Sequence, residues 1–331
     1  MTTYKEIKGT QIEVVSSDPS NPVEGQVWYN STDQAVKGLA LTSADAWATG
    51  GNLNTARGQT GGAGSGETNA LAFGGETPGG ETAVTEKYNG TSWTEVNDLN
   101  AATRLIASIG TTNTAALAVG GYQPPGYQSK VESWDGSSWT ETTNTNSNKG
   151  AGGGAGVQTA ALAFAGVPGG PMATNEYWNG SSWTELNDLN TGRRNGGSSG
   201  ILYTAALYWG GEDPSTTAVT ELWNGTNWTE VNDLNTARSE MAGIGTSTAA
   251  LAAGGFVLPS TRKADVESWN GTNWTETTNI PAVTREYGMG DAGLTNTSGV
   301  VFGGNQAPGR VTTTYEFTAA GTSVTRTFTD S

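Results

Sequence analysis

The sequence predicts an all-β fold of the propeller class, and three repeating features lead to that prediction. A tryptophan recurs at intervals of about 45 residues. A stretch of Gly, Ala and Ser follows each tryptophan at a distance, and an apolar run ending in two small residues comes after it. Each repeat then holds four short segments typical of strands, as one propeller blade does. The recurring tryptophans are Trp47, Trp93, Trp139, Trp183, Trp228 and Trp274.

A tight hairpin is predicted at the outer end of each complete repeat. A second aromatic residue stands five positions before the tryptophan, and Asn-Gly or Asp-Gly with two small polar residues joins the two. These dipeptides tolerate positive φ and favour the turns that connect antiparallel strands. The preceding aromatics are Tyr88, Trp134, Trp178, Trp223 and Trp269.

The glycine-rich segment of each repeat is predicted to be the innermost strand. Blades converge on a central axis, so this strand has room for little more than a hydrogen or a methyl group. Bulky aromatics are expected further out, in the wedges between blades, where each buries ~150 to 250 Å². We therefore interpret Trp93, Trp139, Trp183, Trp228 and Trp274 as core residues.

A family resemblance supports this fold. The double glycine, the Glu-x-aromatic strand, the following tryptophan and the Thr-Ala-Arg segment together resemble kelch repeats, best from Glu221 to Gly255. The likeness runs from about residue 47 to the end of the chain, with a shorter aromatic-to-tryptophan interval than in typical kelch units. In the sixth repeat Phe317 and Val324 replace the expected large aromatics. The resemblance implies a kelch-like β-propeller with four-stranded antiparallel blades.

The expected blade count is six. It follows from the six double-small endings, and the last outer hairpin is expected to combine 313–318 with 323–329. The segment 46–49 resembles a fourth strand that pairs with the last blade and closes the ring. An additional hairpin at 26–30 and 34–37 leaves seven blades as the alternative. The endings are Gly74-Gly75, Gly120-Gly121, Ala165-Gly166, Gly210-Gly211, Gly254-Gly255 and Gly303-Gly304.

Two domains are expected. Residues 1–37 do not share the repeat and contain the additional hairpin, which indicates an attachment arm. Residues 38–331 are assigned to the propeller.

Composition excludes several function classes. The chain has no cysteine and no histidine, which removes thiol nucleophiles, histidine acid–base pairs and most transition-metal sites. Its 31 acidic and 16 basic residues give a net charge of −15, which disfavours nucleic acid. No apolar run reaches the ~18 residues of a membrane span, and the N-terminus lacks a secretory signal. We expect no catalytic residue, no cofactor, no metal site, no membrane insertion and synthesis in the cytoplasm.

Basic residues near the start of each repeat allow two interpretations. A ring of positive charge near the axis would bind an anion, whereas a glutamate near the third strand of each repeat offers an internal ion pair, which we favour. The basic residues are Arg57, Arg104, Lys149, Arg194, Arg238 and Arg285. The glutamates are Glu86, Glu132, Glu176, Glu221, Glu267 and Glu316.

Candidate binding residues lie in the loops after the double-small endings. These loops are long and unlike one another, and in a propeller they share one face with the loops between blades. We predict that Tyr122, Tyr127 and Phe256 are exposed there and contact a ligand. The loops are 76–82, 122–129, 167–173, 212–218, 256–264 and 305–312.

Function is expected from resemblance. Near-identical repeats rich in Thr, Asn, Ser and Gly resemble kelch-like proteins of tailed, particularly marine, bacteriophages. That implies a non-catalytic virion surface protein, either a tail fibre or receptor-binding protein or a capsid decoration. The N-terminal arm would bind other virion proteins, the propeller would bind a host-surface glycan or receptor, and a homo-oligomer is compatible with this role.

Two alternatives remain. The first is a purely structural virion adaptor that contacts only other virion proteins. The second, less favoured, is a sialidase-like enzyme that cleaves glycans. Ser133 to Trp139 resembles an aspartate box but has the wrong spacing, and no pair of carboxylates stands out at glycosidase spacing.

Overall fold

The computed structural model describes residues 12–20, 22, 25–41, 44–281, 290–306, 309–321 and 323–328. These residues form strands, turns and irregular segments, and no helix occurs among them. The chain divides into two compact units. We call Trp47–Phe317 the repeat unit, and Met1–Ala46 together with Thr318–Ser331 the terminal unit.

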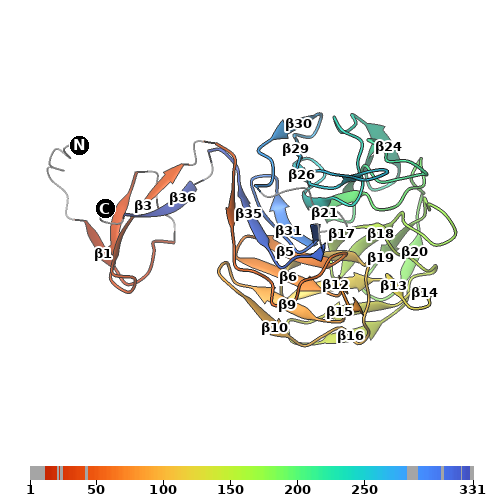
Figure 1. Ribbon diagram of the computed structural model, residues 1–331, viewed down its shortest axis with the longest axis horizontal. Helices are drawn as coiled ribbons and strands as arrows, with labels where there is room; N and C mark the ends of the chain where they lie inside the picture. Colours follow the sequence, from red (N-terminus) through yellow and green to blue (C-terminus); the bar gives the residue numbers. More distant parts are fainter. Residues whose placement is uncertain are drawn as a thin grey trace. The chain divides into compact units, whose positions relative to one another are not determined.

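Six four-stranded sheets build the described part of the repeat unit (Figure 1), and the pairing in sheets I to V is antiparallel. Sheet I contains β5 (Gly61–Gly66), β6 (Asn69–Phe73), β9 (Thr85–Tyr88) and β10 (Trp93–Val96). Sheet II contains β11 (Ala107–Thr112), β12 (Ala115–Val119), β15 (Val131–Trp134) and β16 (Trp139–Thr142). Sheet III contains β17 (Gly153–Val157), β18 (Ala160–Phe164), β19 (Asn175–Trp178) and β20 (Trp183–Glu185).

The remaining three sheets repeat this order. Sheet IV contains β21 (Gly197–Leu202), β22 (Ala205–Trp209), β23 (Thr220–Trp223) and β24 (Trp228–Val231). Sheet V contains β25 (Ala242–Gly245), β26 (Ala250–Ala253), β29 (Val266–Trp269) and β30 (Trp274–Thr277). Sheet VI contains β31 (Gly290–Thr295), β32 (Ser298–Phe302), β35 (Thr314–Thr318) and β4 (Ala46–Thr49).

The outer hairpins follow the predicted turn chemistry. Trp134 lies directly opposite Trp139, and the other four aromatic pairs have the same register. Their ring centroids are 4.9 to 5.6 Å apart. Gly136 in the connecting turn has φ +96°, and the Asp135 carboxylate accepts the N–H groups of Ser137 and Ser138 at 2.8 Å. The predicted tight hairpins are confirmed.

The glycine-rich strands lie at the centre of the repeat unit. β5, β11, β17, β21, β25 and β31 contact one another in this order, and β31 contacts β5 in turn. A Cβ on Gly62 would lie 2.2 Å from the carbonyl oxygen of Asp291, so neighbouring inner strands approach backbone to backbone. The arrangement is propeller-like, and it explains why larger residues are rare on these strands.

The recurring tryptophans fill the wedges between adjacent sheets. Trp93, Trp139, Trp183, Trp228 and Trp274 are 4 to 7% exposed. The core cluster around Trp139 combines Leu71 and Phe73 of sheet I with Ala116 and Ala118 of sheet II. Each of the other four clusters likewise joins residues of neighbouring sheets. The hydrophobic core of the repeat unit is therefore a series of wedges around the centre.

Sheet VI is completed from the beginning of the repeat unit. β4 lies next to β35, as predicted for residues 46–49. The Trp47 indole N–H donates to the carbonyl oxygen of Thr278 at 2.8 Å, and its ring lies 5.0 Å from that of Phe317. The assignment of 323–329 to this sheet was wrong for the described residues 323–328, and residue 329 lies outside the described residues. β36 (Ser323–Phe328) pairs with β3 (Ala35–Leu41), because β4 occupies the strand position beside β35.

The terminal unit has a mixed sheet in the order β1-β2-β3-β36, where β1 is Glu13–Val15 and β2 is Val27–Asn30. β1 and β2 are parallel, and β2 and β3 form the predicted hairpin. Buried Trp28 donates its indole N–H to Asp18 at 2.9 Å. The predicted boundary after residue 37 was wrong, because β3 runs through it and is held on its far side by β36.

Candidate functional site

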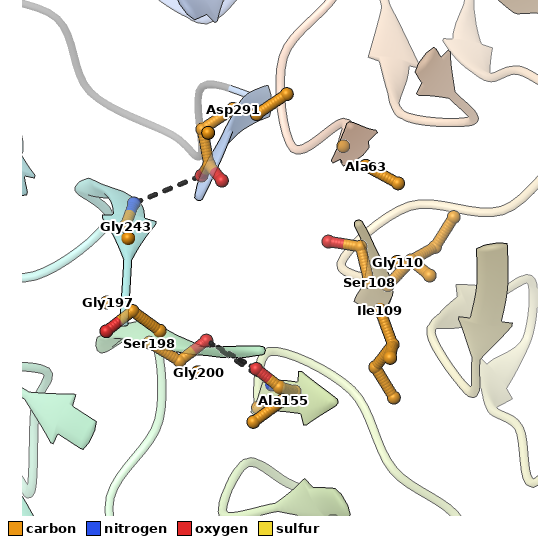
Figure 2. A pocket seen from close by; sticks show the side chains of 18 of the residues that line it. Ala63, Ser108, Ile109, Gly110, Ala155, Gly197, Ser198, Gly200, Gly243 and Asp291 are labelled. Carbon is orange, nitrogen blue, oxygen red and sulfur yellow. Dashed lines mark hydrogen bonds between the residues drawn. The ribbon is translucent and has the colours of Figure 1, made fainter. Parts of the chain in front are cut away.

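An axial cavity of about 160 Å³ lies among the six inner strands. Figure 2 shows Ser108, Ser198 and Asp291 around it. The same strand position is glycine in alternate sheets and a polar residue in the others. In order around the centre these residues are Gly62, Ser108, Gly154, Ser198, Gly243 and Asp291. The glycines make room for close strand contacts, and the polar side chains give the cavity its hydrogen-bonding groups.

Asp291, on the inner strand β31, places a carboxyl group in the wall of this cavity. It accepts one hydrogen bond, from the backbone N–H of Gly243 at 3.1 Å (Figure 2). Among the described lining residues there is no lysine or arginine. Burial raises the pKa of Asp291 to about 7, and the Gly243 N–H only partly opposes this effect. The cavity is therefore poorly suited to an anion.

A ring of left-handed residues borders the cavity, and we call it the mouth ring. It consists of Gln59, Leu105, Ala151, Asn195 and Glu240, whose φ angles lie between 53° and 58°. The backbone N–H of each residue from Leu105 onward donates to the carbonyl of the preceding member at 2.6 to 3.3 Å. Each left-handed non-glycine residue costs ~1 to 2 kcal/mol. Sequence reasoning missed this ring, since nothing in leucine or alanine signals positive φ.

Four of the variable loops are short hairpins beside the mouth ring. Each hairpin consists of two strands of two residues. The pairs are β7 (Glu76–Thr77) with β8 (Gly80–Glu81), β13 (Tyr122–Gln123) with β14 (Gly126–Tyr127), β27 (Phe256–Val257) with β28 (Thr261–Arg262), and β33 (Asn305–Gln306) with β34 (Gly309–Arg310). Glu76, Tyr122 and Phe256 also bridge to the residues immediately before mouth-ring members. Three of the four hairpins are thereby fixed at the edge of the cavity.

The structure separates the three predicted contact residues. Tyr122 and Tyr127 are cross-strand partners with ring centroids 5.3 Å apart, and both are partly exposed. Phe256 is only 9% exposed, so its predicted exposure was wrong. Its backbone exchanges two 2.8 Å hydrogen bonds with Ser239, which holds the start of β27 against sheet V.

A charged cluster adjoins the tyrosine pair. Arg104 contacts Glu76 at 3.1 Å and Glu81 at 3.0 Å, and Arg310 also pairs with Glu76. The Arg104 guanidinium lies 4.8 Å from the centre of the Tyr122 ring. This hairpin face therefore combines aromatic surface with charged hydrogen-bonding groups.

Most of the basic residues predicted near the axis form ion pairs within the fold. The pairs Arg57–Glu86, Lys149–Glu176, Arg193–Glu221 and Arg238–Glu267 are 2.5 to 3.2 Å long and at most 2% exposed. The predicted register was wrong by one residue in two repeats. In sheet IV the buried residue that pairs with the third-strand glutamate is Arg193, where Arg194 was predicted. In sheet II the equivalent position is held by Thr103, where Arg104 was predicted.

The shifted residues have other partners. Arg194 is 44% exposed and lies 3.5 Å from Glu212, whereas Arg104 belongs to the charged cluster. Glu316 accepts the Tyr88 hydroxyl at 2.5 Å. Arg285 lies outside the described residues.

No protein-family model and no curated protein matches the chain. Within the described ranges, no helix is long and apolar enough to cross a membrane. Nor do three acidic side chains gather there closely enough to hold a metal ion.

Proposed function

We propose that the repeat unit is a six-bladed kelch-like β-propeller that acts as a non-catalytic binding module. The cyclic order of the inner strands and the completion of sheet VI by β4 support six blades. The β2–β3 hairpin, which precedes β4 and suggested a seventh blade, belongs to the mixed sheet of the terminal unit.

The observation that carries the proposal is the clustering of the variable hairpins at the cavity mouth. The sheets repeat one design, while the hairpins differ in length and chemistry. Binding residues concentrate on loops that a rigid scaffold positions. A left-handed, hydrogen-bonded mouth ring keeps these loops in place, and strained backbone of this kind occurs at ligand sites.

The ligand that fits this face best is a glycan. Tyr122 and Tyr127 offer amphipathic ring surfaces that combine apolar contact with a hydroxyl group. Arg104, Glu76 and Glu81 supply charged donors and acceptors for hydroxyl groups nearby. By its resemblance to kelch-like proteins of tailed bacteriophages, the chain is proposed to be a virion surface protein that attaches to a host glycan.

Binding to intact candidate host cells tests this function. Full-length protein should bind saturably, and removal of the surface polysaccharide should abolish binding. Tyr122→Ala and Tyr127→Ala should each weaken binding by about tenfold. Thr94→Ala, which changes an exposed residue of outer strand β10, is the matched control. Unchanged binding by both tyrosine variants would remove the hairpin face from the proposal.

A structural adaptor is the second candidate, and the terminal unit supports it. Its sheet combines strands from both ends of the chain into a separate compact unit. An adaptor would need this unit for incorporation into particles. Trp28→Ser, which removes its buried indole and the bond to Asp18, should then prevent incorporation while the repeat unit stays folded. Normal incorporation would contradict the adaptor role.

Glycan cleavage is the third, least favoured candidate. Prolonged incubation of purified protein with host envelope polysaccharide should release no new reducing ends if the protein only binds. Their appearance would replace the binding proposal with an enzymatic one.

A further inference from the structure

Sheet II differs from four other sheets at one buried position. In sheets I, III, IV and V a third-strand glutamate meets Arg57, Lys149, Arg193 or Arg238. In sheet II the glutamate is Glu132, and Thr103 stands where the basic residue would be.

The Glu132 carboxylate keeps the orientation of its four counterparts. Its Oε2 accepts the backbone N–H of Asn100 at 2.9 Å and the Asn100 side-chain amide at 2.7 Å. The equivalent asparagine in each of the other four sheets makes the same two bonds. In those sheets the Oε1 atom faces the basic side chain. Within the described residues, Glu132 Oε1 has no hydrogen-bond partner, and this oxygen is not fully buried.

A small cavity lies beside Glu132. Its volume is about 10 Å³, which admits roughly one particle of the size of water. Thr103, Ala118, Gln123 and Lys130 line it together with Glu132, which is only 7% exposed. Lys130 replaces the missing basic residue only weakly: its ammonium lies 3.8 Å from Glu141, its side chain is 45% exposed, and its charge is the smallest influence on the pKa of Glu132.

The equivalent sheets show which chemistry this position accepts. In sheet III the Lys149 ammonium lies 3.1 Å from Glu176 Oε1 and donates to Thr174 Oγ1 at 2.8 Å. In sheet V, Arg238 also donates to the backbone carbonyl of Ala252. Ala118 holds the same place in sheet II, since it pairs with Glu132 as Ala252 pairs with Glu267. A buried carboxylate next to a carbonyl group favours a single positive charge.

We propose that the cavity beside Glu132 binds a monovalent cation the size of water, ammonium or potassium, in place of the basic side chain. A single carboxylate balances one charge, and with Thr103 in place the volume excludes a hydrated divalent ion. Burial raises the pKa of Glu132 while the Asn100 bonds oppose this effect. A cation at Oε1 stabilises the charged carboxylate that a proton would otherwise neutralise.

Thermal unfolding of the full chain at constant ionic strength tests the site. Tetramethylammonium chloride, whose cation is too large for the cavity, is replaced stepwise by potassium or ammonium chloride. The midpoint of the wild type should rise by about 2 °C and saturate. Thr103→Arg, which supplies the charge covalently, should melt higher in tetramethylammonium and should not respond to either ion. A larger effect of ammonium than of potassium would identify hydrogen bonding as the preferred contact.

Two further variants keep the test decisive if Thr103→Arg does not fold. Thr103→Lys copies Lys149, and Glu132→Gln removes the negative charge, so both should abolish the ion-specific rise. Crystals soaked in a thallium(I) salt should show anomalous density beside Glu132 in the wild type and none in Thr103→Lys. An equal response of wild type and variants, or thallium density only elsewhere, would overturn the proposal. So would a midpoint that depends on pH but not on the cation, because Glu132 would then bind a proton.

Discussion

At the scale of single residues, four of the six sheets bury a charged pair, each a basic side chain with a third-strand glutamate. The Arg238 guanidinium bonds Glu267 and the Ala252 carbonyl, and Glu267 also accepts two bonds from Asn235. Such a network links the segment that enters a sheet to the third strand of the same sheet. Removing one member leaves the other charge buried and unpaired. The resulting loss of stability is larger than the net stabilisation that the intact pair provides.

The Arg238→Ala variant should lower the free energy of unfolding by about 3 to 5 kcal/mol. Arg194→Ala is the matched control, because Arg194 is 44% exposed and lies 3.5 Å from Glu212. It should cost less than about 1 kcal/mol. Urea unfolding followed by tryptophan fluorescence measures both values. Equal losses would mean that burial does not set the strength of these pairs.

Asp291 should give the folded protein a pH dependence of stability opposite in sign to that of an ion-paired acid. Its pKa is about 7 in the folded chain and near 3.8 when unfolded, so the folded state binds more protons between these values. Stability should therefore fall as pH rises from about 4 to 7 and level off above that range. The Asp291→Asn variant should reduce this slope and exceed the wild type by about 1 to 3 kcal/mol at pH 8.

The control for Asp291 is Asp135→Asn. Asp135 is exposed, and backbone N–H groups of Ser138 and Ser137 lower its pKa, so its substitution should leave the slope between pH 5 and 8 unchanged. Urea unfolding at a series of pH values measures both variants. If Asp291→Asn keeps the wild-type slope, the axial carboxyl does not control it.

At the scale of elements, the turns were predictable because their chemistry is local. Asn-Gly and Asp-Gly fix hairpins over four residues, and all five predicted aromatic pairs are in register. The inner strands were equally predictable from the sequence, because only small residues fit where neighbouring backbones approach closely. Both features depend on residues close together in sequence.

Other elements were not predictable because they depend on contacts between distant segments. The burial of Phe256 follows from its bridge to Ser239, and the choice of Arg193 over Arg194 follows from Glu221. The mouth ring depends on hydrogen bonds between successive sheets. The sequence alone does not distinguish Arg193 from Arg194, because the neighbouring strands determine which of the two side chains enters the core.

The hairpin turns allow a clean test at this scale. Gly136 has φ +96° and enough space for a Cβ atom, whose nearest neighbour would lie 3.4 Å away. Gly136→Ala should therefore cost about 1 to 2 kcal/mol through backbone strain alone. Gly126 has open space around it without this strain, so Gly126→Ala should be neutral or stabilise by up to about 1 kcal/mol. Chemical denaturation of both variants compares them, and similar effects would refute the strain argument.

At the scale of the whole molecule, the repeat unit is closed by a strand from its own beginning. β4 completes sheet VI beside β35, while β36 continues into the sheet of the terminal unit. The chain continues from β4 in sheet VI to β5 in sheet I, so the pairing of β4 beside β35 holds the first and last sheets together. The stability of the repeat unit should then depend on β4 and not on β36.

Truncation after residue 322 separates these roles. The shortened chain lacks β36 but keeps all six four-stranded sheets, so the near-ultraviolet circular dichroism of its buried tryptophans should melt within about 2 °C of the full chain. Trp47→Ala in the full chain is the comparison, because it removes the bond to Thr278 and the contact with Phe317. It should lower the midpoint by about 3 to 5 °C. A larger effect of the truncation than of Trp47→Ala would mean that 323–328 stabilises the repeat unit after all, as a strand of the last blade would.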